Sequence, residues 1–134
     1  MSAAQFNWNV RVYYEDTDAA GVVYYANYLR FFERARTEWL RHLGLNQEAL
    51  AAEEGLRFVV RRASLDFIAA ARLDDWLGIS VRILKLARAS LELEQEVCNE
   101  GRRICAATIQ IACLREADFR PVPIPESIRA RMKP

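Results

Sequence analysis

The sequence predicts an α+β protein in which one curved antiparallel sheet of about five strands wraps around one long central helix. Two observations predict this fold. A single long amphipathic segment with an aromatic face occupies residues 23–43. A series of stretches with two-residue hydrophobic alternation follows it, joined by short turns. With 134 residues, the chain is long enough for one core and too short for two, so we expect a single domain over residues 1–134.

The first half of the chain supplies one strand and the long helix. Alternation over residues 9–14 predicts the strand. From about Val23 the period changes to that of a helix of about 18 residues. Its expected buried stripe comprises Tyr28, Phe32, Ala35, Trp39 and Leu43, thickened by Leu29, Phe31 and Leu40. Gly44 is a plausible helix stop, and a short helix over 47–54 should end at Gly55.

The second half supplies the remaining strands. Residues 58–68 indicate one long strand with a bulge or bend, and Asp74-Asp75 a turn. Clean alternation predicts strands over 77–83, 91–97 and 105–113, and Asn99-Glu100-Gly101 predicts a hairpin turn between the last two. The glutamates of segment 91–97 should face solvent. A short helix is expected over 125–132, after a proline-punctuated tail.

Composition restricts the function. A net charge of +1 does not favour nucleic acid or an anionic membrane as a partner. The N-terminus lacks the pattern of a signal peptide, and no apolar run approaches the roughly 20 residues of a membrane span, so we expect no membrane insertion. Three cysteines without a CxxC motif indicate reduced thiols in a cytoplasmic protein. The single histidine, His42, excludes a histidine-based metal cluster.

The motif Asp16-Thr17-Asp18 precedes the long helix and has several interpretations. An aspartate-based phosphatase would need a parallel sheet, which the pattern does not offer. Two carboxylates without further ligands are weak support for a metal pair. The residues could simply cap the helix. Alternatively, Asp18 just before a helix N-terminus would set a nucleophile or base beside free backbone N–H donors, as acyl transfer requires.

The segment from Glu15 to Tyr28, EDTDAAGVVYYANY, closely resembles the signature of the 4-hydroxybenzoyl-CoA thioesterase family, whose members have the hotdog fold. The resemblance continues through residues 29–41, LRFFERARTEWLR, and is strongest to the YbgC-type acyl-CoA thioesterases associated with the Tol-Pal system. Beyond about Gly44 the order of elements still fits. The resemblance therefore implies a hotdog acyl-CoA thioesterase that works without a metal or prosthetic group.

Site residues follow from the resemblance. Asp18 matches the family's catalytic aspartate, acting as nucleophile at the thioester carbonyl or as general base for water. Gly21 would let the backbone turn tightly, and the Tyr25 N–H would meet the thioester oxygen. Asn27 would support that geometry. Tyr25 stands where Tol-Pal-associated members often carry histidine, which puts the substrate in question more than the reaction.

Basic residues could bind the phosphates of coenzyme A, among them Arg61 with Arg62, Lys85 with Arg88, and Arg102 with Arg103. The family commonly places phosphate-binding residues where this chain has Arg88-Ala89-Ser90. We expect Arg88, Ser90 and Arg61 to contribute, and the 102–103 pair to be a solvated hairpin tip.

An open sheet edge beside one helix favours a homodimer or a homotetramer built from dimers. The resemblance adds that family sites lie between two subunits. The acyl group could be aliphatic or aromatic, and acyl carrier protein is an alternative donor. A non-catalytic acyl-binding scaffold with the same fold is the main competing hypothesis. A hotdog dehydratase is less consistent with the chain, because those enzymes typically use a histidine.

Overall fold

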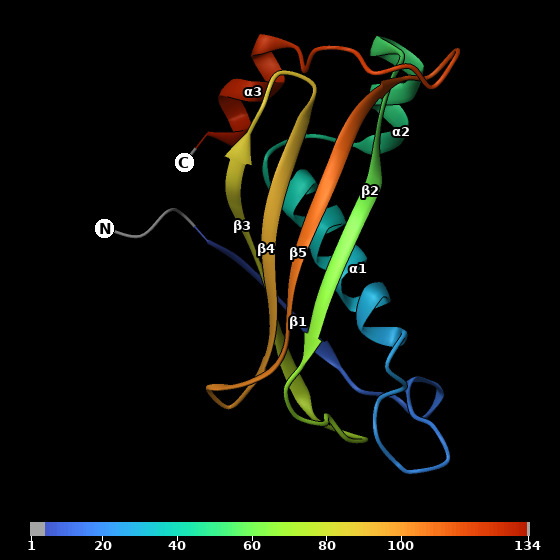
Figure 1. Ribbon diagram of the computed structural model, residues 1–134, viewed down its shortest axis with the longest axis vertical. Coiled ribbons are helices and arrows are strands. Elements are labelled where there is room, and N and C mark those ends of the chain that lie inside the picture. Colours follow the sequence, from blue (N-terminus) through green and yellow to red (C-terminus); the bar gives the residue numbers. More distant parts are fainter. Residues whose placement is uncertain (1–4, 134) are drawn as a thin grey trace.

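A computed structural model describes residues 5–133 of the chain (Figure 1). Five strands form one sheet. In chain order they are β1 (Phe6–Arg11), β2 (Leu56–Phe67), β3 (Trp76–Leu86), β4 (Ser90–Asn99) and β5 (Arg102–Arg115). The long helix is α1 (Asn27–His42), and short helical segments are η1 (Tyr14–Asp16), α2 (Gln47–Ala49), η2 (Leu50–Glu54) and α3 (Glu126–Met132).

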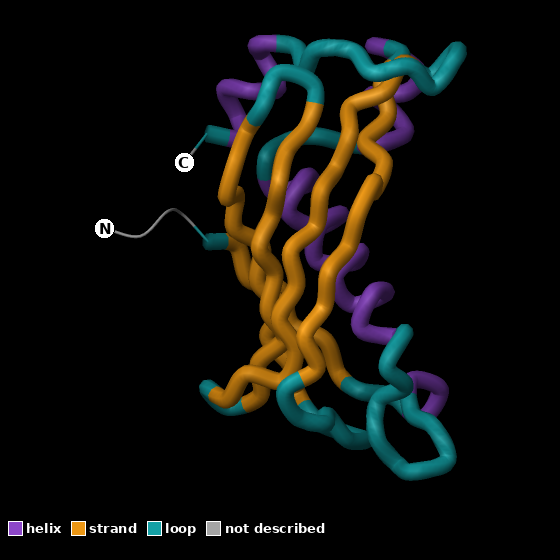
Figure 2. The backbone as a smooth tube through the Cα atoms, in the orientation of Figure 1, coloured by secondary structure: helices purple, strands orange, loops and turns teal. Residues whose placement is uncertain are grey.

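The sheet is antiparallel throughout, in the order β1-β3-β4-β5-β2, and it curves around α1 (Figures 1 and 2). β1 and β2 are therefore the two edge strands. The predicted hotdog architecture, a sheet of five strands around a central helix, is confirmed.

The core lies between α1 and the concave face of the sheet. The helix buries Tyr28, Phe31, Phe32, Ala35, Trp39 and Leu40 of the expected stripe. Placing Leu29 in that stripe is wrong, because Leu29 is exposed, and Leu43 is only partly buried. The sheet meets it with alternate residues, among them Leu77, Ile79, Leu93, Val97, Ile109 and Ile111. Burying this much apolar surface is what holds a helix and a sheet together.

One polar side chain ties the two layers together. Gln95 of β4 is fully buried among the inward-facing residues. Its Nε2 donates to the carbonyls of Phe32 and Ser80, and its Oε1 accepts from Arg36 at 3.0 Å. Each buried polar atom of Gln95 therefore has a partner, which avoids the cost of an unsatisfied group.

The predicted helix start at about Val23 is wrong, because α1 begins at Asn27. Val22 and Val23 instead form β-bridges with Arg72 and Thr17, and Val23 is buried. Tertiary pairing has overridden the helical period of the side chains. The first strand likewise ends at Arg11, short of the predicted Tyr14, because the chain turns through η1.

Other boundaries agree closely with the predictions. Gly44 follows α1 with a φ of 81°, a left-handed conformation that glycine adopts without strain. The short helical segment runs over 47–54, β2 carries its irregularity between Val60 and Arg62, and α3 occupies the predicted terminal position.

Cys105 and Cys113 are fully buried, Cys98 is half-buried, and all three are free thiols. Burial raises the pKa of each of the first two thiols to about 11. Within residues 5–133, no helix is long and apolar enough to cross a membrane.

Candidate active site

The residues between η1 and α1 form a small hairpin. Thr17 and Val23 form an antiparallel bridge, and the Asp18 N–H donates to the Val22 carbonyl at 2.9 Å. The Gly21 N–H closes a turn on the Asp18 carbonyl at 3.0 Å. Gly21 has a φ of 78°, so the tight turn expected here depends on glycine.

Asp18 is exposed at the first position of this turn. Its Oδ1 accepts from the Ala20 N–H at 2.9 Å, which holds the carboxyl group against the loop. Oδ2 accepts no hydrogen bond from any residue of the described range 5–133. One oxygen thus orients the carboxylate and the other stays available for chemistry.

The start of α1 carries a free backbone donor. The Asn27 N–H donates to the Tyr24 carbonyl at 2.8 Å, which forms the first turn ahead of the helix. Tyr25 is the second residue of that turn, and among residues 5–133 its N–H has no acceptor. Such N–H groups at a helix start carry partial positive charge and bind negatively charged oxygens.

The expectation that Asp18 lies directly before the helix is wrong, since residues 19–26 separate it from α1. The hairpin folds this intervening segment back on itself. The pKa of Tyr24 is raised by interaction with Tyr25, by burial and by the negative charge of Asp18. The hydrogen bonds from the Asp18 N–H to the Val22 carbonyl and from the Tyr24 N–H to the Asp16 carbonyl, both 2.9 Å, hold Asp18 in the same loop that leads into α1.

Asp16, not Asp18, anchors the helix start. Its carboxylate is buried and accepts from the Asn27 Nδ2 at 2.9 Å and from the Tyr13 N–H at 2.8 Å. The Asp16 carbonyl also accepts from the Tyr24 N–H at 2.9 Å. Asn27 is therefore buried in a contact with Asp16, where it supports the loop; its side chain does not line the loop surface.

Aromatic side chains gather beside the hairpin. The Tyr24 and Tyr25 rings lie 4.9 Å apart, and Tyr25 meets Phe67 edge-on at 6.0 Å. The ring of Phe67 also lies 5.9 Å from that of Tyr28. Tyr25 is 62% exposed and Phe67 53%, so an apolar group could pack on this wall. Sequence reasoning missed Phe67, because it is distant in the chain and only the end of β2 brings it here.

The expected phosphate-binding residues are only partly brought together. Arg61, Lys85 and Ser90 line a common pocket of about 130 Å³, with Glu92 and Gln110. Arg88 does not line it; its carbonyl accepts from the Ile124 N–H. The turn between β3 and β4, beside this pocket, lies at the opposite end of the sheet from the 17–23 hairpin (Figure 1). Within one chain, the pocket lined by Arg61, Lys85 and Ser90 is therefore far from Asp18.

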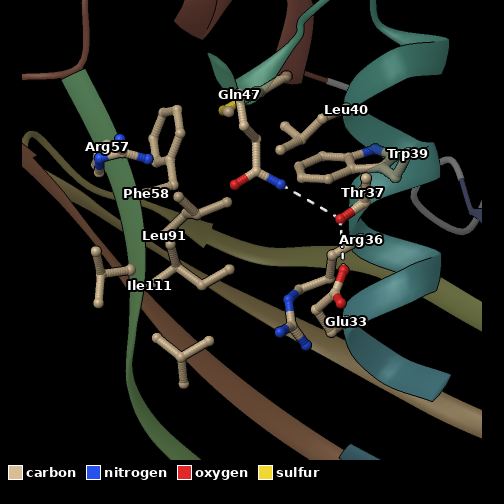
Figure 3. A pocket seen from close by; sticks show the side chains of 13 residues that line it. Glu33, Arg36, Thr37, Trp39, Leu40, Gln47, Arg57, Phe58, Leu91 and Ile111 are labelled. Carbon is tan, nitrogen blue, oxygen red and sulfur yellow. Dashed lines mark hydrogen bonds between the residues drawn. The ribbon is translucent and has the colours of Figure 1, made fainter. Parts of the chain in front are cut away.

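A larger cavity of about 350 Å³ lies between α1 and the sheet (Figure 3). Polar residues line its helix side, where Gln47 donates to Thr37 and Thr37 donates to Glu33. The sheet side is apolar and includes Phe58, Leu91 and Ile111. Trp39 belongs both to the hydrophobic core and to the wall of this cavity. Arg36 also lines the cavity, and burial lowers the pKa of its guanidinium group.

Comparison with known proteins gives the class that this fold and loop define. Residues 12–132 match the model of the thioesterase-like superfamily. The chain is 45% identical over 134 residues to the acyl-CoA thioester hydrolase YbgC of Escherichia coli O6:H1, covering 99% of both chains. It is 43% identical over 125 residues to the acyl-CoA thioesterase YbgC of Haemophilus influenzae, covering 93% of this chain and 92% of that one.

The solved structures agree. A probable thioesterase from Bartonella henselae superimposes with a TM-score of 0.87 at 40% identity, covering 91% of this chain and 100% of that chain. The chain belongs to the thioesterase-like superfamily. The resemblance found in the sequence is thereby confirmed, and the protein is a thioester hydrolase with the hotdog fold.

Proposed function

We propose that the protein hydrolyses acyl-CoA to the free acid and coenzyme A, with the Asp18 carboxylate and the Tyr25 N–H as its catalytic groups. The observation that carries this proposal is that the loop leading into α1 presents both an oriented, exposed carboxylate and, among residues 5–133, an amide without an acceptor. The YbgC relatives, named as acyl-CoA thioesterases, support the choice of substrate.

The Tyr25 N–H would donate to the thioester oxygen, which gains negative charge as the carbonyl carbon becomes tetrahedral. One donor of this kind contributes about 10²–10³ in rate. Asp18 would act in one of two ways. It either attacks the carbonyl carbon, expels the coenzyme A thiolate and forms an anhydride that water hydrolyses, or it takes a proton from the water that attacks. Neither route requires a metal or a prosthetic group.

The acyl group is expected to be short and aliphatic, or aromatic. The wall formed by Tyr25 and Phe67 offers exposed ring faces for either. Arg61 and Ser90, with Lys85, are the best-placed residues for the phosphates of coenzyme A. Arg88 would have to reach them from outside that pocket. Acyl carrier protein remains an alternative donor of the acyl group.

The working unit is expected to be a homodimer, or a homotetramer built from dimers, in the cytoplasm. Because the basic pocket and Asp18 lie at opposite ends of one sheet, a second subunit would have to supply phosphate contacts to each site. The open edge of β2 is available for such an assembly.

Thiol release from a panel of acyl-CoAs tests the proposal, from propionyl to palmitoyl together with benzoyl and 4-hydroxybenzoyl. Asp18→Asn is the decisive variant, because its amide oxygen can still accept from the Ala20 N–H and so keep the loop. We expect this variant to fold and to lose turnover. Full activity in Asp18→Asn would overturn the assigned role of the carboxylate.

The competing function is a non-catalytic acyl-CoA or acyl-carrier-protein scaffold. It predicts binding of acyl-CoA without thiol release by either protein. Isothermal titration of the same panel, run beside the activity assay, separates the two.

A further inference from the structure

The cavity between α1 and the sheet has a polar side and an apolar side (Figure 3). Its volume of about 350 Å³ lies within the range of about 300–1,000 Å³ that is typical of small-molecule sites. The sheet contributes Phe58, Leu91 and Ile111, and the helix contributes Arg36 and Leu40. A ligand of this cavity would therefore need both a polar group and an apolar body.

Arg36 brings a positive charge to this cavity without a carboxylate partner. The residue is half-buried, and its guanidinium group donates to the neutral Gln95 Oε1 at 3.0 Å. Among residues 5–133 it forms no ion pair and has no other acceptor. Burial lowers the pKa of this guanidinium group, because it removes water that would stabilise the charge. Several of its N–H groups are thus available to an acceptor that enters the cavity.

The other charged residues of the lining differ from Arg36. Arg57 forms an ion pair with Glu116, so its charge is compensated. Glu33 is the acidic residue among the described residues of the lining. It is exposed, accepts from the Thr37 hydroxyl at 2.7 Å and forms no ion pair with Arg36. The half-buried charge of Arg36 therefore has no direct counter-charge within the described chain.

We propose that this cavity binds a carboxylate carried on a short apolar chain, with the carboxylate on Arg36 and the chain along Leu40, Phe58 and Leu91. Arginine suits this ligand, because its planar fork of N–H groups matches the two oxygens of a carboxylate. The ligand would also compensate a charge that burial has made costly. From Arg36 to Leu40 the helix rises about 6 Å, which provides an apolar surface for a chain of a few carbons.

Two molecules could supply such a carboxylate. One is the free acid that thioester hydrolysis releases, which would act as a bound product. The other is an acyl-CoA whose acyl group carries a second carboxylate at its far end. The first source needs only the cavity, whereas the second rests on the acyl-CoA hydrolysis proposed above.

Isothermal titration of the wild type with hexanoate tests the site, with hexanamide as the uncharged control. Hexanoate should bind at least about tenfold more tightly than hexanamide. Arg36→Met removes the charge and keeps most of the stem, so it should weaken hexanoate binding at least about tenfold, and Arg36→Lys should weaken it less. Arg34→Met is the matched control, because Arg34 is exposed on the same helix and does not line the cavity. It should leave the Kd unchanged.

Glu33→Gln provides a measurement of opposite sign. The variant keeps an acceptor for the Thr37 hydroxyl and removes a negative charge that repels a carboxylate. Hexanoate should therefore bind about two- to fivefold more tightly. Arg36→Met leaves Gln95 Oε1 without its donor and could fail to fold. In that case the exposed Glu33 still tests the proposal.

Thiol release from adipoyl-CoA and hexanoyl-CoA separates the two sources. If the second carboxylate of an acyl group is the ligand, adipoyl-CoA should have the lower KM, and Arg36→Met should remove the difference. If the free acid is the ligand, adipoyl-CoA should have no such advantage. Hexanoate should then inhibit turnover of hexanoyl-CoA in the wild type and much less in Arg36→Met.

The outcomes also separate this proposal from the proposed function. Equal binding of hexanoate and hexanamide, or no change of Kd in folded Arg36→Met and Glu33→Gln, overturns the carboxylate site. Failure of hexanoate to bind, together with equal KM values for the two acyl-CoAs, overturns it as well. Binding of hexanoate without thiol release from any acyl-CoA supports the site and overturns the proposed hydrolysis alone.

Discussion

Replacing Tyr25 by proline would remove the proposed oxyanion donor and leave the fold intact. Tyr25 is the second residue of the turn from Tyr24 to Asn27, a position that favours proline. Its N–H makes no hydrogen bond within residues 5–133, so the fold loses none. Proline is also tolerated at the start of a helix for this reason.

The expected loss is large. Removing one oxyanion donor costs about 10²–10³ in kcat, or about 2.7–4 kcal/mol of transition-state stabilisation. Tyr25→Pro also removes the ring that contacts Tyr24 and Phe67. Tyr25→Ala is therefore the matched control, because it removes the same ring and keeps the N–H.

The assay is thiol release at saturating acyl-CoA, with urea unfolding of each variant to check the fold. We expect Tyr25→Ala to change KM more than kcat, and Tyr25→Pro to lower kcat by a further factor of about 10² or more. Equal kcat values in two folded variants would refute the assignment of this amide.

Three further predictions concern the loop and the core. Asn27→Ala removes the donor to the buried Asp16 carboxylate and should cost about 1.5–3 kcal/mol in urea unfolding, whereas Asn27→Asp would also add a repelling charge. Gly21→Ala should cost about 1–2 kcal/mol through its positive φ alone, since nothing lies within 4 Å of the added Cβ, and Gly21→Asn should cost less. Burial raises the pKa of Cys105 and Cys113 to about 11, above the ordinary value of 9.0. In the unfolded chain these thiols ionise from about pH 9, whereas in the folded protein they stay protonated until about pH 11. Their contribution to the free energy of unfolding should therefore be constant below about pH 9 and fall between pH 9 and 11. Urea unfolding at pH 8 and pH 10.5 checks this, and Cys113→Ala should show a smaller decrease.

Much of the fold was predictable from local pattern. The stripe containing Phe32, Ala35 and Trp39 identified the buried face of α1, and two-residue alternation located β3, β4 and β5. These patterns are reliable because a helix or strand that buries one face must repeat its apolar residues at its own period. The helix start was not predictable, since the side chains of Val22 and Val23 suit a helix as well as the bridges they form.

The candidate site divides in the same way. The sequence motif identified Asp18, Gly21 and Tyr25 as candidate site residues. It did not show that Asp16 and Asp18 have different structural roles. Only the structure shows that Asp16 is buried against Asn27 while Asp18 is exposed. Phe67 and the separation of Arg61 from Arg88 depend on contacts between distant segments, which carry no local signal.

The sequence by itself determined the class of fold, because hydrophobic periodicity is a local property of the chain. Its resemblance to a thioesterase signature, and no local pattern, supplied the turn glycine and the residues proposed here for acyl transfer. Tertiary structure decided which carboxylate faces solvent, which amide stays free and which strand edge stays open. Those features depend on burial and pairing between segments far apart in the chain, and local preferences are too weak to settle them.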